Sequence, residues 1–386
     1  MGATETPADR VIPVFDLRFT PEDLDAVVAT LRSGWLTMGP RTQQFEQAFA
    51  ETIGARHAVA VANCTAALHL ACLAVGIGPG DEVIVPSYTM VATAAAVLHA
   101  GGTPVFADIV DREQPVIDPA HVETLLTPRT RAVIAMHFGG YGCALDRLSG
   151  ICSQHGLALL EDAAHAPIAT VAGRSVGTWG AAGTFSFFSN KVLAVGEGGL
   201  LATDDDEIAA FARSRRGHAM TTVSWDRARG RRGRYDVPGL GFNYRIDDLR
   251  SGLLLSRLRR LRDEISQRRA LTRRYRRLLA GLPGLRVPFS DDAVETSSCY
   301  VMPVMLEDPQ LQAPLRLALR QKHGVQTSVF YPAIHEFSAY RRRFPDVSLP
   351  QTELAARSEV TLPLFPHLTE ADQDQVIAAL AAELGT

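Results

Sequence analysis

Short apolar runs alternate with longer Ala- and Leu-rich stretches from about residue 57 to 205. The short runs are rich in β-branched residues and apolar on both faces, which is typical of strands buried between layers of helices. This alternation predicts βα units around a mostly parallel sheet, and therefore an α/β fold. The predicted strands span residues 57–62, 82–86, 104–108, 132–137, 157–162, 183–188 and 199–203.

The pattern changes near residue 246. Residues 246–279 are Leu-rich on one side, and ten arginines fall between positions 257 and 277, which predicts one long helix. Such a helix could be a nucleic-acid-binding arm or a solvated connector, and the connector is favoured because acidic residues balance the whole chain. Beyond Pro283, a strand-like run at 300–306 and helical segments near 314–323 and 370–384 predict a smaller α+β domain.

Length and charge narrow the class of protein. A chain of 386 residues suggests about two domains. We expect residues 1–255 to form the large domain, with 1–25 packing near the small one, and 256–386 to form the small domain with its connecting helix. Lys plus Arg number 39 against 42 for Asp plus Glu, so a net charge of −3 gives no global field to attract nucleic acid or an anionic membrane.

The five cysteines are scattered and include no C-x-x-C pair, as expected for reduced thiols in the cytoplasm. Neither a signal peptide nor an apolar run of membrane-spanning length is present. The sequence contains no phosphate-binding P-loop and no clustered Cys/His metal pattern. The glycines at 196–199 do not open a helix after a strand, so a dinucleotide fingerprint is not supported. We expect no metal.

Three polar features fall where predicted strands end, the edge of an open α/β sheet at which ligands bind. Asp162 closes an apolar run and needs a cationic partner, either a protonated pyridine nitrogen or a structural arginine. Lys191 lies among apolar and small residues and is either a Schiff-base lysine or a surface lysine. Thr65 and the Ala66 amide lie at a helix start, which could cradle a phosphate or be an ordinary Thr N-cap. Together they describe what pyridoxal phosphate requires.

The chain resembles the DegT, DnrJ and StrS group of pyridoxal-phosphate sugar aminotransferases of fold type I, almost from end to end. The motifs that carry the resemblance are GWLTMGP at 34–40 with Phe45-Glu46, NCTAAL at 63–68, PSYT at 86–89, EDAAHA at 161–166, SFFSNK at 186–191 with GEGG at 196–199, GFNYR at 241–245 and LPLFP at 362–366. The resemblance implies a large domain with a seven-stranded, mostly parallel sheet flanked by helices, and a smaller α+β domain.

The same resemblance assigns roles to residues. Lys191 would attach the pyridoxal phosphate and then move the proton between cofactor and substrate, and Asp162 would keep the pyridine nitrogen protonated. His165 would lie beside the ring's phenolic oxygen, with a core histidine as the alternative. The phosphate would be held by Thr65, the Ala66 amide and Ser186, and by Asn243 of the other protomer, which implies a homodimer with shared sites.

Two positions depart from the family pattern. Cys64 stands where members often have glycine, and Met90 stands where many have an aromatic ring that covers the cofactor. A methionine can still cover a ring through its polarizable sulfur. The cofactor assignment is unaffected, whereas looser stacking on the ring or a differently shaped substrate pocket is expected.

Substrate recognition is predicted at a polar segment rich in arginine. We hypothesise that Arg227, Arg229, Arg231, Arg232 and Arg234 meet the diphosphate of a nucleotide-linked keto-sugar, because guanidinium groups suit diphosphates. A merely solvated loop is the alternative. Arg245, Tyr331 and His335 resemble family positions that line the sugar and co-substrate end.

The predicted activity is transamination in amino-sugar or secondary-metabolite biosynthesis. Glutamate or glutamine would give its amine to pyridoxal phosphate, and the pyridoxamine form would pass it to a keto-sugar, preferably a nucleotide-linked keto-deoxyhexose. Keto-cyclitol and aminobenzoate-type transamination are alternatives. Dehydrating relatives carry His in place of the lysine, so Lys191 argues against them. A regulatory protein that keeps only the fold is the non-enzyme alternative.

Overall fold

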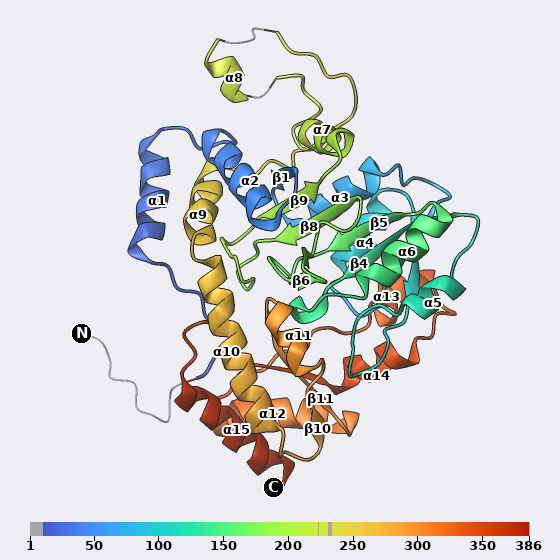
Figure 1. The fold of residues 1–386 in the computed structure, drawn as a ribbon, viewed down its shortest axis with the longest axis vertical. Coiled ribbons are helices and arrows are strands. Elements are labelled where there is room, and N and C mark those ends of the chain that lie inside the picture. The colour runs from blue at the N-terminus through green and yellow to red at the C-terminus, as the bar shows by residue number, and fades with distance from the viewer. Residues whose placement is uncertain (1–10, 223, 231–233, 386) are drawn as a thin grey trace.

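A seven-stranded sheet forms the centre of the computed structural model, which describes residues 11–222, 224–230 and 234–385 (Figure 1). The strand order is β1-β9-β8-β5-β4-β2-β3. The strands are β1 (His57–Val61), β2 (Glu82–Pro86), β3 (Thr103–Ala107), β4 (Thr130–Met136), β5 (Ala158–Asp162), β8 (Ala182–Ser186) and β9 (Gly199–Thr203). Only β9 runs antiparallel to its neighbours, so the predicted mostly parallel seven-stranded sheet is confirmed.

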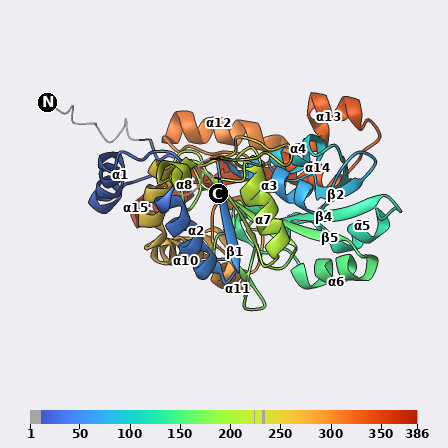
Figure 2. The ribbon, with the colours of Figure 1, turned by 90° about the horizontal axis from the view of Figure 1, so that it is seen from above.

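Helices cover both faces of this sheet (Figure 2). The helices of the described residues are α1 (Pro21–Arg32), α2 (Pro40–Ile53), α3 (Cys64–Ala74), α4 (Ala92–His99), α5 (Pro119–Thr124), α6 (Leu145–His155), α7 (Asp206–Arg215), α8 (Ser224–Ala228), α9 (Asp248–Leu258), α10 (Leu261–Leu279), α11 (Asp291–Thr296), α12 (Gln312–His323), α13 (Ser338–Arg343), α14 (Pro350–Ser358) and α15 (Glu370–Leu384). Buried residues of α2 and α6 share one core with the sheet, whereas α3, α4 and α7 belong to a second core. Burial on both faces explains the continuous apolar runs of the strands.

A smaller antiparallel sheet lies beyond α10, at the lower end of Figure 1. It consists of β10 (Leu285–Arg286), β11 (Met302–Leu306) and β12 (Glu359–Leu362), and its core includes residues of α12 and α15. Residues 12–14 join this part: the Ile12 amide donates to the Gly324 carbonyl at 2.8 Å, and the Leu364 amide donates to the Val14 carbonyl at 3.1 Å. A separate hairpin, β6 (Thr170–Val171) with β7 (Arg174–Ser175), follows β5.

Two helix predictions were wrong in detail. The single helix expected over 246–279 is two helices, α9 and α10, because Arg260 leaves helical geometry (φ −108°, ψ 5°). Its guanidinium binds the Asp23 carboxylate of α1 at 2.6 and 2.8 Å, and Glu264 at 2.7 Å. The helix expected to begin at Ala66 begins at Cys64, and Asn63 rather than Thr65 is its N-cap.

The buried Asp248 carboxylate fixes the start of α2. Gly39, the N-cap of α2, has no side chain to cap the helix, and a Cβ there would collide with the Trp35 indole. Asp248 of α9 supplies the missing acceptor: it accepts hydrogen bonds from the amides of Gly39 (2.8 Å), Arg41 (3.1 Å) and Thr42 (3.0 Å) and from the Thr42 hydroxyl (2.7 Å). One carboxylate thus holds residues 39–42, the start of α2, against α9.

Asp248→Ala is expected to lower the free energy of unfolding by about 3–5 kcal/mol, because four donors, three of them in buried hydrogen bonds, lose a charged acceptor at once. Urea unfolding followed by circular dichroism measures this loss. Asp247→Ala is the matched comparison. Asp247 caps only α9, where it accepts from the amide and from the partly exposed guanidinium of Arg250, both at 2.8 Å, and its loss should cost about 1 kcal/mol. Equal losses in the two variants would contradict the proposed capping of α2.

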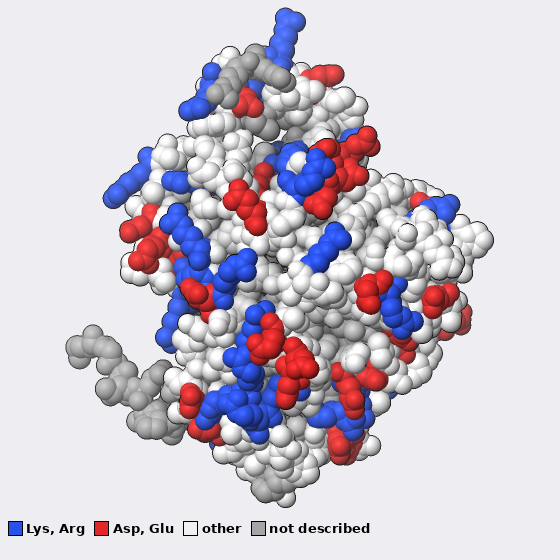
Figure 3. All heavy atoms as spheres, in the orientation of Figure 1, with Lys and Arg blue, Asp and Glu red and all other residues white. Residues whose placement is uncertain are grey.

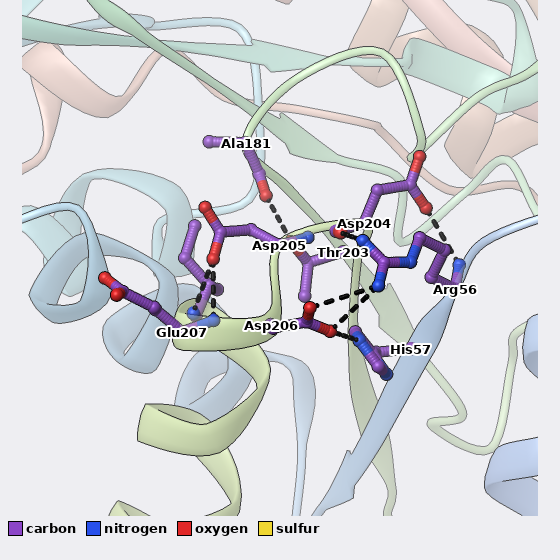
Figure 4. A network of polar contacts seen from close by, with 9 residues as sticks. Arg56, His57, Ala181, Thr203, Asp204, Asp205, Asp206 and Glu207 are labelled. Atoms are coloured by element: carbon purple, nitrogen blue, oxygen red, sulfur yellow. Dashed lines mark hydrogen bonds and ion pairs between the residues drawn. The ribbon is translucent and has the colours of Figure 1, made fainter.

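An exposed polar network ties the start of β1 to the start of α7 (Figure 4). Asp206 accepts two hydrogen bonds from the Arg56 guanidinium, both at 3.1 Å, and one contact from His57 Nε2 at 2.6 Å. Asp205 caps α7 by accepting from the amides of Glu207 (2.7 Å) and Ile208 (3.1 Å). The network fixes α7, from which the chain enters the segment with α8 that projects at the top of Figure 1.

Acidic and basic side chains are intermixed on the face shown in Figure 3. Several arginines of α10 lie in ion pairs, including Arg273 with Glu295 at 2.6 Å and Arg274 with Asp374 at 2.8 Å. This pairing fits the connector interpretation of the arginine-rich stretch. Among the described residues, no helix is long and apolar enough to cross a membrane.

Candidate active site

A cavity of about 380 Å³ opens where β1, β5 and β8 end. Thirteen of the residues that line it come from the motifs singled out in the sequence or flank them directly: Asn63, Cys64, Thr65, Leu68, Met90, Asp162, Ala164, His165, Ser186, Phe188, Asn190, Lys191 and Glu197. They are far apart in the chain, and parallel strands bring them to one edge of the sheet. The structure therefore places the predicted lysine, carboxylate and helix start around one space.

Asp162 is the buried anion of the cavity. Its side chain, on the last residue of β5, is 3% exposed. One oxygen accepts a hydrogen bond from the Thr93 hydroxyl at 2.7 Å and the other accepts from the Ala164 amide at 3.2 Å. Burial raises the pKa of this carboxyl, while these hydrogen bonds and the charge of Lys191 oppose the rise. A carboxylate in such a place is stabilised by a cation beside it.

Lys191 supplies the amine of the cavity. It follows β8 in an irregular segment, and its Nζ lies 4.5 Å from the centre of the Tyr300 ring. Burial lowers the pKa of Lys191 to about 8, and the nearby Asp162 charge opposes that decrease. The chain has only one other lysine, Lys322, which is exposed and pairs with Glu383 at 3.0 Å. Lys191 is therefore the lysine suited to nucleophilic attack.

The rate at which cofactor-free protein captures pyridoxal phosphate is expected to rise about tenfold per pH unit up to about pH 8 and then to level off. The reason is that only the neutral amine attacks the aldehyde, and Lys191 loses its proton near pH 8 rather than at 10.5. Stopped-flow absorbance between pH 6.5 and 10 measures the profile, and Lys322→Ala should leave it unchanged. A rate that still climbs at pH 10 would contradict the lowered pKa.

His165 and Tyr331 form a hydrogen-bonded pair at the cavity wall. His165 Nδ1 accepts from the Gly139 amide at 3.3 Å, so Nε2 carries the proton and donates it to the Tyr331 oxygen at 2.8 Å. Burial and the charge of Lys191 hold the pKa of His165 well below its usual value. Burial also raises the pKa of Tyr331. The pair is therefore neutral, and the Tyr331 hydroxyl can donate to an oxygen in the cavity.

The predicted phosphate end is built by the start of α3. Thr65 and Ser186 line the cavity, whereas the Ala66 amide donates to the Asn63 side chain at 2.9 Å. In this structure, therefore, the Ala66 amide is the N-cap donor of α3. Burial raises the pKa of the Cys64 thiol, so Cys64 is a neutral, apolar part of the wall.

The remaining predicted residues lie outside this cavity wall, except Met90, which lines it and is half exposed. His335 is buried between Ser87 (2.8 Å) and Glu353 (3.4 Å). Arg245 lines a small hollow with Arg213, Arg227, Thr37 and Met38. Asn243 is exposed and forms an isolated antiparallel β-bridge with Gly217. The Arg229 guanidinium stacks on the Trp225 ring. Arg231 and Arg232 lie outside the described residues.

Sequence reasoning missed Tyr300 and Thr93. Tyr300 contacts both Lys191 and the His165 ring, with ring centres 4.3 Å apart in the latter case. Thr93 binds Asp162 and also the Thr89 hydroxyl at 3.0 Å. Thr89 belongs to the PSYT motif at 86–89, and Thr93 follows it by four residues, so the sequence could have indicated Thr93 as a further site residue. No sequence signal indicated Tyr300, because it lies 109 positions beyond Lys191 and outside every quoted motif.

The residues present fit pyridoxal phosphate. The buried Asp162 carboxylate suits a protonated ring nitrogen, Lys191 suits the aldehyde carbon, and the hydroxyls of Thr65 and Ser186 suit a phosphate. The neutral Tyr331 hydroxyl suits the ring's phenolic oxygen. All of these groups lie on one cavity, and no metal-binding cluster occurs among the described residues.

Comparisons with known proteins agree with this fit. A model of the DegT/DnrJ/EryC1/StrS aminotransferase family matches residues 18–381. The spore coat polysaccharide biosynthesis protein SpsC of Bacillus subtilis is 40% identical over 364 residues, 93% of each protein. The crystal structure of the aminotransferase TlmJ from Streptoalloteichus hindustanus has a TM-score of 0.90 and 35% identity, covering 97% of this chain and 99% of that one. NtdA from Bacillus subtilis, solved with the cofactor PMP, has a TM-score of 0.85 and 26% identity, covering 100% of this chain and 86% of that one.

Proposed function

The chain belongs to the DegT/DnrJ/EryC1/StrS aminotransferase family and is a pyridoxal-phosphate-dependent aminotransferase, and from this premise we propose that it aminates a keto-sugar. The proposed acceptor is a nucleotide-linked keto-deoxyhexose, and the proposed donor is glutamate or glutamine. The observation that carries the proposal is that Lys191 and Asp162 face one cavity at the carboxyl edge of the sheet.

Several residues of the chain would serve the two half-reactions, in which the donor's amine passes to the cofactor and then to the acceptor. When bound, pyridoxal phosphate supplies a ring that accepts electrons from the carbon being deprotonated. Asp162 would keep the ring nitrogen protonated, and Thr93 and the Ala164 amide hold that carboxylate in place. Lys191, whose pKa burial lowers to about 8, would take the proton from the donor and give it to the acceptor. The Tyr331 hydroxyl, oriented by His165, would donate to the phenolic oxygen.

Arginines support the nucleotide part of the proposal. Arg213, Arg227 and Arg245 converge on the hollow beside Thr37 and Met38, and two or more guanidinium groups suit a diphosphate. Arg227 is already bonded to the Thr222 carbonyl at 2.7 Å, so Arg213 and Arg245 are the stronger candidates there.

A single-turnover assay tests the acceptor class. The protein is first converted to its amine-loaded form with excess glutamate and desalted, and is then mixed with nucleotide-linked keto-hexoses, free keto-sugars and keto-cyclitols. Return of the lysine-bound absorbance band with a nucleotide-linked keto-hexose supports the proposal. Return with keto-cyclitols alone would favour a cyclitol aminotransferase, and no return with any acceptor would overturn the sugar assignment.

We also propose a cytoplasmic homodimer in which Asn243 reaches the phosphate of the partner's cofactor. Asn243 is exposed and does not line the cavity of its own chain, and the five cysteines are free and buried.

A complementation experiment tests the shared sites. In each proposed site, Lys191 comes from one protomer and Asn243 from its partner, so Lys191→Ala and Asn243→Ala each remove a different contribution. Mixing the two variants in equal amounts after brief unfolding is therefore expected to restore about a quarter of wild-type activity. Each variant refolded alone is the control, and failure to regain activity would contradict shared sites.

A further inference from the structure

A second cavity, of about 370 Å³, lies on the other side of residues 189–192. We call it the arginine cavity, because Arg18, Arg257, Arg260 and Arg268 line it. Its wall also includes residues 15–17, Thr20, residues 366–367, and Asp263, Glu264 and Gln267 of α10. Asn190 and Lys191 line both this cavity and the cofactor cavity, so the reactive lysine is part of the wall of both.

Arg268 is a buried cation without a carboxylate partner among the described residues. Its side chain is 4% exposed, and its Nη1 donates only to the carbonyls of Tyr300 (3.3 Å) and Leu364 (3.1 Å). Its Nε has no hydrogen-bond partner. Burial lowers the pKa of Arg268 to about 10, which still leaves it charged at neutral pH. Burying an unpaired guanidinium is costly unless an anion approaches it.

The other charges around the arginine cavity are largely paired with one another. Arg260 binds Asp23 and Glu264, and Asp16 binds His367 at 2.6 Å and Arg18 at 3.4 Å. Arg257, 3% exposed, reaches Glu264 at 3.4 Å but leaves its Nε without a partner. Four arginines and Lys191 stand against three carboxylates of the wall, Asp16, Asp263 and Glu264, and against Asp23 behind Arg260, so one positive charge is in surplus.

We propose that the arginine cavity binds a carboxylate of the amino-acid donor, with Arg268 as its buried cation. The inference rests on the proposed function, in that it requires an amino acid as the donor. An amino acid that brings its amine to Lys191 keeps its carboxylates within a few bonds of that point, and the arginine cavity begins at Lys191. A guanidinium with free N–H groups matches a carboxylate through paired hydrogen bonds.

Binding of glutarate to the holoenzyme, measured by titration calorimetry, tests the carboxylate site without any reaction. Gln267 is exposed and lines the arginine cavity, whereas its exposed neighbour Ser266 does not. Gln267→Glu is therefore expected to weaken glutarate binding about tenfold through charge repulsion, and Ser266→Glu, which adds the same charge outside the cavity, to change it less than twofold. Arg268→Gln should lose binding and Arg268→Lys should retain part of it.

Absence of glutarate binding to the wild type, or equal affinities in Gln267→Glu and Ser266→Glu, would overturn the proposal even if Arg268→Gln fails to fold. UDP is titrated in parallel: a loss of UDP binding with unchanged glutarate binding in Gln267→Glu would assign the cavity to a nucleotide diphosphate instead. Failure of the proposed function appears separately, as failure of amine-loaded enzyme to aminate any keto-sugar while glutarate still binds.

Discussion

Lys191→Ala is expected to reduce amino-group transfer by about 10⁴-fold or more, with the folded structure retained. In the proposed mechanism, the variant lacks both the amine that would attach the cofactor and the group that would move the proton at the reacting carbon. Donor and acceptor half-reactions should fail together, because both need that proton transfer. Single-turnover absorbance with glutamate, followed by a keto-sugar nucleotide, measures each half separately.

Because the chain has two lysines, a single control variant is enough to assign the reactive one. Lys322→Ala removes the only other lysine, which is exposed and paired with Glu383, and should leave activity unchanged. Reduction of the holoenzyme with borohydride, followed by peptide mass spectrometry, should place the cofactor on Lys191. A modified Lys322, or a Lys191→Ala variant with substantial activity, would refute the assignment.

Asp162→Asn should lower the rate of the donor half-reaction by about 10²–10⁴-fold, which corresponds to about 3–5 kcal/mol. Asparagine keeps the size of the side chain: its oxygen can still accept from the Ala164 amide, and its NH2 group can donate to the Thr93 hydroxyl, which turns to Thr89, but the side chain is neutral. It therefore no longer favours a protonated ring nitrogen, and the ring becomes a weaker electron acceptor. Stopped-flow measurement of the half-reaction with glutamate gives the rate.

A cofactor analogue separates charge from structure at this position. Pyridoxal phosphate methylated on the ring nitrogen carries a fixed positive charge, so it should restore part of the rate in Asp162→Asn. Thr93→Val is the milder companion, expected to cost about fivefold through the loss of one hydrogen bond to Asp162. Wild-type rates in Asp162→Asn with ordinary cofactor would contradict the proposed role.

Residues at strand ends could be predicted from the sequence because the apolar runs mark where strands stop. Asp162 closes β5, and Lys191 follows β8 by five residues, so the sheet itself determines which edge they share. Tyr300 and Arg268 could not be found in this way. They reach the site from the segments that surround the smaller sheet, and nothing in their local sequence encodes how that part packs against the large sheet.

The hydrogen-bond partners of small polar side chains in loops also could not be predicted from the sequence. Asn63, Thr65 and Ser186 are all small and polar, and each could cap a helix or face a ligand. The structure chooses Asn63 as the cap of α3 and leaves Thr65 and Ser186 toward the cavity. The break between α9 and α10 was missed for a related reason: neither Gly nor Pro marks it, and only the contact with Asp23 on α1 distinguishes Arg260 from its neighbours.

Because lysine is rare in this chain, cleavage by a lysine-specific protease can report local unfolding at two defined places. An endoprotease specific for lysine has only two peptide bonds to cut, one after Lys191 beside the cofactor cavity and one after Lys322 within α12. Helical backbone is a poor protease substrate until it unfolds locally, so cleavage after Lys322 reports the opening of α12 away from α15. Cleavage after Lys191 reports release of the segment that separates the two cavities. The two fragment patterns thus record local unfolding at the small sheet and at the active site independently.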